Sequence, residues 1–422
     1  MKLLWLSSVD LSEPINRSGT WIRSMFNNII DSDEIEELNI FTFQTIRNCS
    51  VVELKKGKQY TFFKKKGLFY NSFKNGTKSE IINIVVSLNP DIIHIWGTES
   101  GWDDIVNDPR LNNIPKLLEI QGLRTAICLP IYSNAGLDRL WERKSSFSDY
   151  ILSSLKEIRT RIIVKRLVRN EQHLIETSTY ISTQSEWVRS VIECIRTPST
   201  QIFNSSIILR PDFVNQKPWS SIHRSADKKT IFILADLRVA KGIHTALEAI
   251  ALVKSKVSDI TVRIAGLPDI ISLKSKYGYK GYLYRLIMKL GLQDDVNFLG
   301  YLDANEIRSE MYKCDVYLNT TYIESYCLSL AEALSIGVPC AVSYTSALPE
   351  LIEDNVNGLL FPIGDIYICA SKIKAILLNS EIAISLGDKA YSSMKDKTSD
   401  ERSISQQLST YRKILSKKYE AS

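Results

Sequence analysis

Glu324-Ser-Tyr-Cys-Leu-Ser-Leu-Ala-Glu332 is the stretch that decides the fold. It carries two carboxylates eight residues apart, where a strand-like pattern gives way to a helix-like one. The mostly apolar run 315–318 before it is typical of a buried strand. The apolar residues within 328–334 recur at helical spacing. The sequence therefore predicts a strand, a short loop that carries Glu324, and a helix that carries Glu332.

This order of elements favours a binding site for a phosphorylated ligand. Open α/β sheets bind ligands where strand ends face helix starts. A helix N-terminus also offers free N–H groups and a positive dipole end to phosphate. Glu324 would lie at the mouth of the site, and Glu332 roughly 12 Å further in if the spacing were wholly helical. Two carboxylates so placed suit hydroxyl groups at both ends of an extended ligand, and a nucleotide sugar has that shape.

Further short motifs accompany this stretch in a fixed order. The set resembles the donor-site signature of retaining glycosyltransferases of the GT-B architecture, in the large family numbered four. Two glutamates at this spacing occur often by chance, so the resemblance depends on the ordered set. Its other members are Leu-Arg-Val-Ala-Lys-Gly (237–242), Ile-Ala-Gly (264–266), Phe-Leu-Gly-Tyr (298–301), Pro-Glu-Leu-Ile (349–352) and Asn-Gly-Leu-Leu (357–360).

The resemblance implies an α/β fold in which two Rossmann-like β/α/β domains face each other across a cleft. The 422 residues are enough for two domains, and strand-like and helix-like segments alternate in both halves, which favours parallel sheets. We predict an N-terminal acceptor domain over 1–212 and a C-terminal donor domain over 213–398. The proline-containing, aperiodic segment 210–228 is the predicted linker. By resemblance, the helix within 399–422 packs back on the first domain.

The resemblance also implies roles for the donor-site residues. Glu324 would contact the hydroxyls of the donor sugar and Glu332 those of the ribose. Relatives usually have glycines where Ser325 and Cys327 stand, so the room beside the sugar is narrower here. Gly266 has an alternative interpretation as an ordinary turn glycine, and Tyr301 as part of a buried strand and its turn. The remaining implied donor-binding residues are Tyr326 and Leu328.

A lysine stands at the start of the predicted helix that follows the strand 230–234. Lys241 could neutralise the diphosphate as it leaves, where negative charge develops in the transition state. The alternative is a solvated lysine near a helix start. Relatives often have an arginine five residues earlier, where this chain has Asp236, so we predict that Arg238 supplies the second cation.

Three residues of the first half are candidates for the acceptor or reaction-centre side. Gly19 lies in the loop after the first strand, which matches a glycine-bearing loop of the family. Gln121 follows the strand 116–120 where many relatives have a histidine, and its amide can hydrogen-bond a sugar hydroxyl but cannot act as an acid or base. His94 lies in mid-strand, so a core histidine is the alternative to a place near the cleft.

Composition is that of an ordinary globular protein, with 44% apolar and 24% charged residues and a net charge of +6. Its seven cysteines are scattered without a C-x-x-C pair, which argues against a disulfide framework or a structural zinc and favours the cytoplasm. The apolar run 1–6 is too short for a signal peptide, and no window approaches the ~20 apolar residues of a membrane span.

The segment 55–66 combines six lysines with three aromatic residues and has no acidic residue. A solvated hairpin is one interpretation. Docking to an anionic membrane surface is another, since each lysine near such a surface contributes ~1 kcal/mol. We do not expect nucleic-acid binding, because the sequence has no recognised RNA or DNA motif.

By resemblance, we expect a retaining hexosyltransferase that moves a sugar from a nucleotide-diphosphate sugar to a glycan or lipid-linked glycan acceptor. The expected setting is bacterial surface-polysaccharide assembly, in the cytoplasm or peripherally on the inner face of the cell membrane. No metal or cofactor is expected. The alternatives are a nucleotide-sugar epimerase of the same fold, a glycoside hydrolase that uses Glu324 and Glu332 as paired carboxyls, and a catalytically silent sugar-binding protein.

Overall fold

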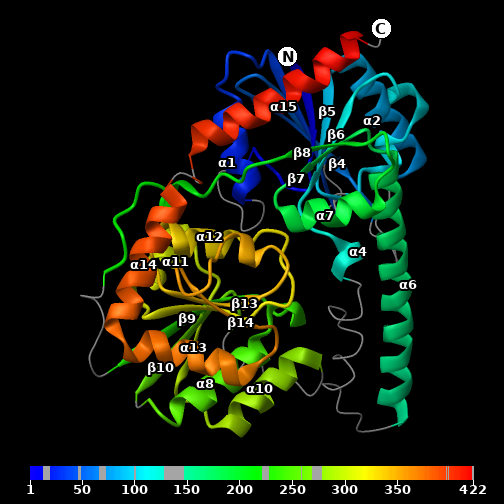
Figure 1. Ribbon diagram of the computed structural model, residues 1–422. Helices are drawn as coiled ribbons and strands as arrows, with labels where there is room; N and C mark the ends of the chain where they lie inside the picture. The colour runs from blue at the N-terminus through cyan, green and yellow to red at the C-terminus, as the bar shows by residue number, and fades with distance from the viewer. Residues whose placement is uncertain are drawn as a thin grey trace. The chain divides into compact units, whose positions relative to one another are not determined.

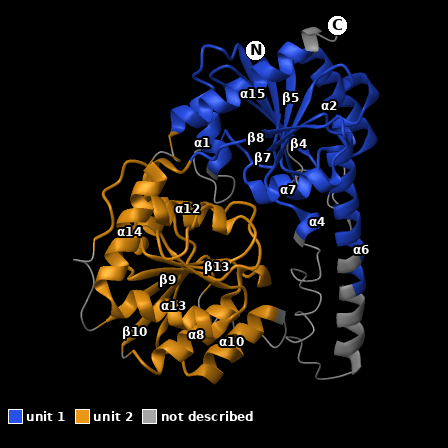
Figure 2. Cartoon of the chain, in the orientation of Figure 1, with its two compact units in different colours: residues 1–128, 147–208, 400–422 blue, residues 129–146, 209–399 orange. Residues whose placement is uncertain are grey.

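The protein is known from a computed structural model of the whole chain. It divides into two compact units, one of residues 1–128, 147–208 and 400–422 and the other of residues 129–146 and 209–399 (Figure 2). Each is described separately below. The structure describes residues 1–12, 20–45, 49–65, 73–98, 101–127, 147–220, 228–257, 259–268, 278–395, 397 and 399–420.

Unit 1 is built on an eight-stranded sheet, within the described residues, in the order β3-β4-β2-β1-β5-β6-β7-β8 (Figure 1). Its neighbouring strands are parallel except β3 and β4, which form an antiparallel hairpin. The strands are β1 (Lys2–Leu6), β2 (Glu37–Gln44), β3 (Ser50–Leu54), β4 (Gly57–Phe63), β5 (Ile92–Trp96), β6 (Lys116–Ile120), β7 (Tyr180–Thr183) and β8 (Gln201–Asn204).

The central strands of this sheet are buried on both faces, as parallel strands covered by helices must be. All five residues of β5 are buried, and four of the five in β1 and in β6. The described helices are α1 (Thr20–Ile29), α2 (Asn75–Leu88), α3 (Asp103–Val106), α4 (Arg124–Ile127), α6 (Phe147–Thr177), α7 (Glu186–Ile195) and α15 (Asp400–Glu420), with the 3-10 turn η2 (Pro109–Leu111).

Helix α15 comes from the end of the chain and lies beside α1 (Figure 1). Leu408, Tyr411 and Ile414 of α15 are buried in the core that contains Trp5 of β1. The Trp5 indole Nε1–H donates to the Tyr411 hydroxyl over 3.2 Å. The last helix therefore packs into the core of unit 1.

Unit 2 is built on a six-stranded parallel sheet, within the described residues, in the order β11-β10-β9-β12-β13-β14. The strands are β9 (Lys229–Leu234), β10 (Ile260–Ala265), β11 (Val296–Gly300), β12 (Val316–Asn319), β13 (Cys340–Tyr344) and β14 (Leu359–Pro362). The α-helices are α8 (Ile243–Lys254), α10 (Gly278–Leu290), α11 (Ala304–Lys313), α12 (Leu328–Ser335), α13 (Ile366–Leu378) and α14 (Ser380–Lys395). The 3-10 turns are η3 (Pro211–Phe213), η5 (Val239–Lys241) and η6 (Leu348–Glu350).

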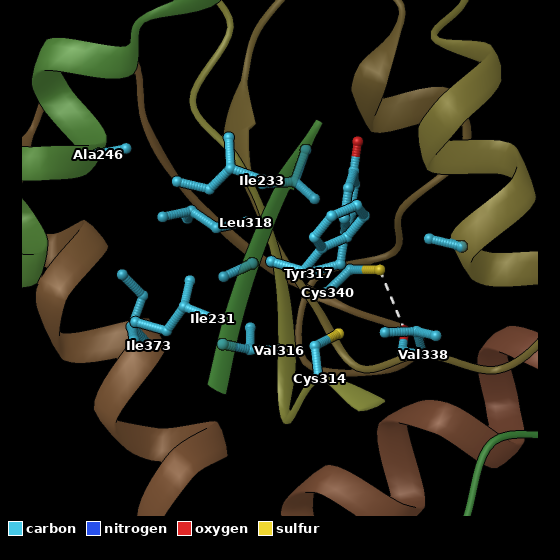
Figure 3. Close-up of a cluster of buried hydrophobic side chains, with 14 of the residues drawn as sticks. Ile231, Ile233, Ala246, Cys314, Val316, Tyr317, Leu318, Val338, Cys340 and Ile373 are labelled. Carbon is cyan, nitrogen blue, oxygen red and sulfur yellow. Dashed lines mark hydrogen bonds between the residues drawn. The ribbon is translucent and has the colours of Figure 1, made fainter. Parts of the chain in front are cut away.

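The core of unit 2 surrounds the two central strands. Ile231 and Ile233 of β9 lie beside Val316 and Leu318 of β12 (Figure 3). On the same core, the thiol of Cys340 donates to the Val338 carbonyl over 3.0 Å. Two parallel sheets, each layered with helices, confirm the predicted α/β class.

The segment that enters unit 2 is packed rather than free. Phe213 and Trp219 belong to the buried core of the unit. The Trp219 backbone N–H donates to the Ile336 carbonyl over 2.7 Å, and its indole N–H to the Cys314 carbonyl over 3.0 Å. Residues 209–219 are therefore held firmly against the α12 side of the sheet.

Among the helices that the structure describes, none combines the length and the apolar character needed to cross a bilayer.

Gly242 is a position where the fold requires glycine. Its φ is +65°, and a Cβ there would overlap the carbonyl oxygen of Thr320. We expect Gly242→Ala to lower the free energy of unfolding by ~3 kcal/mol or more, because backbone would have to move. Gly291→Ala is the control, since Gly291 has the same φ but open space around it and should cost only about 1–2 kcal/mol. Urea unfolding checks both, and equal losses would contradict the steric explanation.

Candidate functional site

The donor-side residues predicted from the sequence come together at the carboxyl edge of the unit 2 sheet. Strands β9 and β12 are parallel neighbours, so the loops after them leave the same edge. Backbone and side-chain bonds join the two loops. The Tyr322 N–H donates to the Ala240 carbonyl over 2.7 Å, and the Thr320 hydroxyl to the Gly242 carbonyl over 2.9 Å.

Lys241 and Glu324, predicted as catalytic residues from motifs far apart in the sequence, form an ion pair. The Lys241 ammonium donates to Glu324 Oε1, which also accepts from the Thr321 hydroxyl over 3.3 Å. Burial disfavours the charged ammonium, but the Glu324 carboxylate outweighs it and raises the pKa of Lys241. The side chains remain 21% and 17% exposed, so an incoming ligand can still reach both. The pair offers a fixed cation to phosphate and a carboxylate to hydroxyl groups.

The turn between Glu324 and α12 is strained at Cys327, the N-cap of the helix. Cys327 has φ +78°, a conformation that favours glycine, although its side chain is buried. Its thiol accepts from the Asn319 amide over 3.2 Å, and burial raises its pKa to about 11, so the thiol is neutral. The Cys327 side chain makes no capping bond to α12. N–H groups at the start of a helix are the groups that a helix N-terminus offers to an anion. The other predicted residues of this segment, Ser325, Tyr326 and Leu328, are partly exposed.

Glu332 lies inside α12 and is fully buried. Its carboxylate accepts from Arg210 Nε over 2.5 Å and from Arg210 Nη2 over 2.6 Å. Burial raises the pKa of Glu332, and the guanidinium offsets part of that rise. Sequence reasoning missed Arg210, because nothing in a proline-containing connection marks one arginine as the partner of a residue 122 positions later.

Arg238 is paired with the aspartate that replaces the arginine usual in relatives. Its Nε donates to Asp236 over 2.9 Å, and the side chain is 69% exposed. The Asp236 carboxylate raises the pKa of Arg238. The charge of Arg238 in the loop after β9 is thus balanced by Asp236. The catalytic role of Arg238 stays a prediction.

Gly266 and Tyr301 lie at the neighbouring strand ends. Gly266 has φ +90°, and a Cβ there would approach the Ala235 carbonyl oxygen to 2.5 Å. Packing of β10 against β9 therefore accounts for this glycine without a ligand. Tyr301 follows β11 and is 62% exposed. Their predicted contacts with the donor stay predictions.

In unit 1, Gly19 lies outside the described residues. Gln121 is partly exposed and follows the end of β6. The segment after it is held by Glu171 of α6, which sequence reasoning missed. The buried Glu171 carboxylate accepts from the Thr125 backbone N–H and hydroxyl, each over 2.7 Å, and from the Thr98 hydroxyl over 2.7 Å. Glu171 therefore fixes the loop that carries Gln121.

His94 lies in the core of the unit 1 sheet. It is fully buried, stacks on Trp96 with ring centroids 4.0 Å apart, and its Nδ1 lies 2.7 Å from the Tyr411 hydroxyl. Burial lowers its pKa to about 3. This environment favours the core interpretation over a place at the acceptor.

The described part of the segment 55–66 consists of the short connection after β3 and the strand β4, and β3 and β4 form an antiparallel hairpin. Phe62 is 6% exposed and packs on Phe41, and Lys64 is buried beneath the rings of Phe43 and Phe73. Those two side chains cannot enter a lipid surface as placed. Lys55 and Lys58 are exposed and paired with acidic neighbours. These contacts favour the solvated-hairpin interpretation.

Within the described residues, no group of three or more His, Cys, Asp or Glu side chains is placed to hold a metal ion. The described cysteines are all free: Cys49, Cys194, Cys314, Cys327, Cys340 and Cys369.

The whole chain is similar in fold to solved glycosyltransferase structures. It matches sucrose-phosphate synthase from Thermosynechococcus elongatus with a TM-score of 0.74 at 17% identity, over 99% of this chain and 100% of that chain. It also matches Anabaena HepE in complex with UDP and glucose, with a TM-score of 0.63 at 15% identity, over 97% of this chain and 99% of that chain. These likenesses confirm the predicted GT-B fold class.

Residues 215–393 match the family model described as glycosyl transferases group 1. The chain therefore carries a domain of this family, which confirms the family predicted from the donor-site motifs. It is 28% identical over 187 residues to the amylovoran biosynthesis glycosyltransferase AmsK of Erwinia amylovora, covering 43% of this chain and 42% of that protein. It is 24% identical over 191 residues to the N-acetyl-alpha-D-glucosaminyl L-malate synthase of Bacillus anthracis, covering 45% and 47%. These matches span less than half the length of either relative.

The buried pair of His94 and Glu119 gives a test of the unit 1 core by pH. Glu119 Oε2 lies 3.9 Å from His94 Nε2, and burial raises the pKa of Glu119 from 4.5 to about 7. Stability from the protonated carboxyl is full below pH 4.5 and is lost as pH rises through 7. The lowered pKa of His94 acts oppositely, because its neutral form stabilises the fold above pH 6.5 and that stability is lost as pH falls.

We therefore expect the two effects to oppose each other between pH 4.5 and 6.5 in the parent protein. In Glu119→Gln only the histidine effect remains. The free energy of unfolding should then rise with pH more steeply than in the parent, by up to about 1.4 kcal/mol per pH unit. Urea titrations across this window measure it, and parallel pH profiles for the two proteins would rule the explanation out.

Proposed function

We propose that this protein is a retaining hexosyltransferase that transfers a sugar from a nucleotide-diphosphate sugar to a glycan or lipid-linked glycan. The observation that carries the proposal is the ion pair of Lys241 and Glu324 beside the N-terminus of α12, the helix that also carries Glu332. This arrangement supports donor binding by unit 2. Relatives named for amylovoran and colanic acid biosynthesis support a role in bacterial polysaccharide assembly.

The proposed roles follow from the charges. The donor diphosphate would lie against the Lys241 ammonium and the N–H groups at the start of α12. Glu324 would accept hydrogen bonds from the sugar, and Glu332 from the ribose. Solved fold neighbours bound to UDP, such as HepE and the Staphylococcus aureus protein TarM, support a nucleoside diphosphate as the leaving group.

In the transfer step, the bond between the anomeric carbon and the phosphate oxygen breaks. A new bond to the acceptor oxygen forms on the same face of the sugar. The acceptor proton passes to the departing phosphate oxygen, so no protein nucleophile is required. Lys241 would act on the negative charge that develops on that oxygen, where a preorganised cation is most effective.

The acceptor side is proposed for unit 1, with Gln121 offering its amide to an acceptor hydroxyl. We propose that the protein acts in the cytoplasm. We also propose that it needs no metal ion, because Lys241 and the N-terminus of α12 supply positive charge at the diphosphate. Activity should then persist in excess EDTA.

A paired-carboxyl hydrolase suits the geometry less well, because Glu332 is buried and both its oxygens are engaged by Arg210. An epimerase of the same fold would convert the donor sugar without any acceptor, which incubation with donor alone detects. A silent sugar-binding protein would bind donor without turnover across an acceptor panel.

A thermal-shift screen against UDP-, GDP-, ADP- and dTDP-sugars tests donor binding directly. A ligand that binds only the folded state raises the midpoint, by an amount equivalent to about 2.7 kcal/mol at a hundred times its Kd. We expect one nucleotide class to give a clear upward shift. No shift with any of the four, at millimolar concentration, would contradict the proposed function.

Variants of the ion pair test the catalytic assignment. Glu324→Gln should reduce transfer at least ~100-fold, and Lys241→Met should lower kcat by ~100- to 1000-fold. Lys254→Met is the control, because Lys254 forms a comparable ion pair with Asp295 elsewhere on the same unit. Near-parent rates in Glu324→Gln or Lys241→Met, with normal folding by circular dichroism, would remove that residue from the mechanism.

A further inference from the structure

Helix α6 carries an exposed stripe that combines apolar and basic side chains. Ile158 and Ile162 are 55% and 50% exposed, and Lys165 and Arg169 are exposed as well. Successive members of this set are four, three and four residues apart, so they project from the same side of the helix. The α6 stripe, as we call these four residues, is about 17 Å long.

The α6 stripe lies beyond the carboxyl edge of the unit 1 sheet. The Glu171 carboxylate of α6 accepts from Thr98, after β5, and from Thr125, after β6, so the helix passes that edge at Glu171. It then continues to the start of β7, which is parallel to β6, and therefore runs opposite to the strands. The earlier residues of α6 extend past the strand ends (Figure 1), on the side where Gln121 lies.

The charge of this part of the helix has one sign. Residues 158–170 include five basic side chains and no acidic one. Arg159 and Arg166 are exposed next to the α6 stripe. Scattered exposed isoleucines are ordinary on a protein surface. Two of them one turn apart on a basic face form the pattern of a helix that lies on a membrane surface.

This combination favours an anionic lipid surface over other polyanions. Lysine and arginine side chains are attracted to anionic head groups, and their long stems let neighbouring apolar side chains enter the boundary between head groups and acyl chains. A nucleic acid would use the cations alone, since proteins grip its bases with aromatic rings rather than with isoleucine. The isoleucines therefore decide between the two partners.

We propose that the α6 stripe docks the protein on an anionic membrane surface. Ile158 and Ile162 enter the head-group boundary, and the neighbouring cations contact the lipid head groups. The α6 stripe replaces the segment 55–66 as the membrane contact. It lies on the side of unit 1 that the proposed function assigns to the acceptor, so docking would bring that side to a lipid-linked acceptor. The inference does not depend on sugar transfer.

Flotation of the full chain with lipid vesicles tests the docking. Phosphatidylcholine vesicles that contain about 30% phosphatidylglycerol are compared with vesicles of phosphatidylcholine alone, and we expect binding only to the anionic ones. Binding should weaken at least ~10-fold between about 0.1 M and 1 M NaCl, because salt screens the attraction.

Two double variants test the α6 stripe itself. Ile158→Ser with Ile162→Ser should lower the partition coefficient on anionic vesicles ~10-fold or more, because the apolar anchor is lost. Lys165→Gln with Arg169→Gln should lower it ~25-fold, since each cation near an anionic surface contributes a factor of about 5. All four side chains are exposed, so circular dichroism and urea unfolding should match the parent protein.

The matched control is Lys55→Gln with Lys58→Gln. It lowers the net charge as much as the basic α6 variant does, and it removes two exposed lysines of the hairpin in the same unit. Because those lysines are paired with acidic neighbours, this variant should bind anionic vesicles within about 2-fold of the parent protein.

Four outcomes would overturn the inference. The parent protein might bind neither kind of vesicle, or both kinds equally. Folded α6 variants could bind like the parent while the hairpin control loses binding, which would place the contact at the hairpin. Binding to an oligonucleotide that exceeds vesicle binding, and that survives loss of the isoleucines, would make this a nucleic-acid surface. A parent dimer that the isoleucine variant dissociates, with vesicle binding unchanged, would make it a contact between copies.

The failure of this inference can be told apart from the failure of the proposed function. Transfer of sugar to a soluble acceptor by a protein that binds no vesicles would leave the proposed function standing. Vesicle binding without transfer to any acceptor would leave the docking surface standing alone.

Discussion

Parallel pairing of β9 with β12 is the constraint on which the candidate site depends. The two strands are separated by more than eighty residues in sequence, yet Ile231 pairs with Val316 and Phe232 with Tyr317 in the middle of a buried sheet. Because both strands point the same way, their following loops meet at one edge. That edge receives Lys241 from one loop and Glu324 from the other, and burial of the apolar strands holds the ion pair in place.

Charges at this edge occur as compensated pairs. Lys241 faces Glu324, Arg238 faces Asp236, and Arg210 faces Glu332. Removing one partner of a buried pair is strongly destabilising, because the other charge is left without compensation. A donor diphosphate bound at Lys241 would bring its own negative charge to the cation and leave the Glu324 carboxylate for hydroxyl groups. Under the proposed function, the ammonium of Lys241 would exchange the Glu324 carboxylate for the donor diphosphate as its partner.

The loops at the edge of the unit 1 sheet are held by buried polar side chains. Glu171 fixes the segment after β6, and the Gln59 side chain accepts from the backbone N–H groups of Leu11 and Ser12, each within 3.0 Å, after β1. Buried carboxylates and amides of this kind are costly unless their partners are all present, so they specify a single loop conformation. Both units therefore position loops at strand ends by contacts that come from elsewhere in the chain.

The sequence by itself determined the α/β class, the family, and the pairing of a strand, a loop with Glu324 and a helix with Glu332, because each follows from local periodicity and ordered motifs. It also placed Lys241 at a helix start. Only the tertiary structure decided that Arg210 pairs with Glu332, that Glu171 holds the Gln121 loop, and that His94 is enclosed by Trp96 and Tyr411. The physical reason is range. Periodicity reports which face of an element is buried, whereas a partner 46, 122 or 317 residues away, as in these three contacts, is chosen by the packing of whole elements.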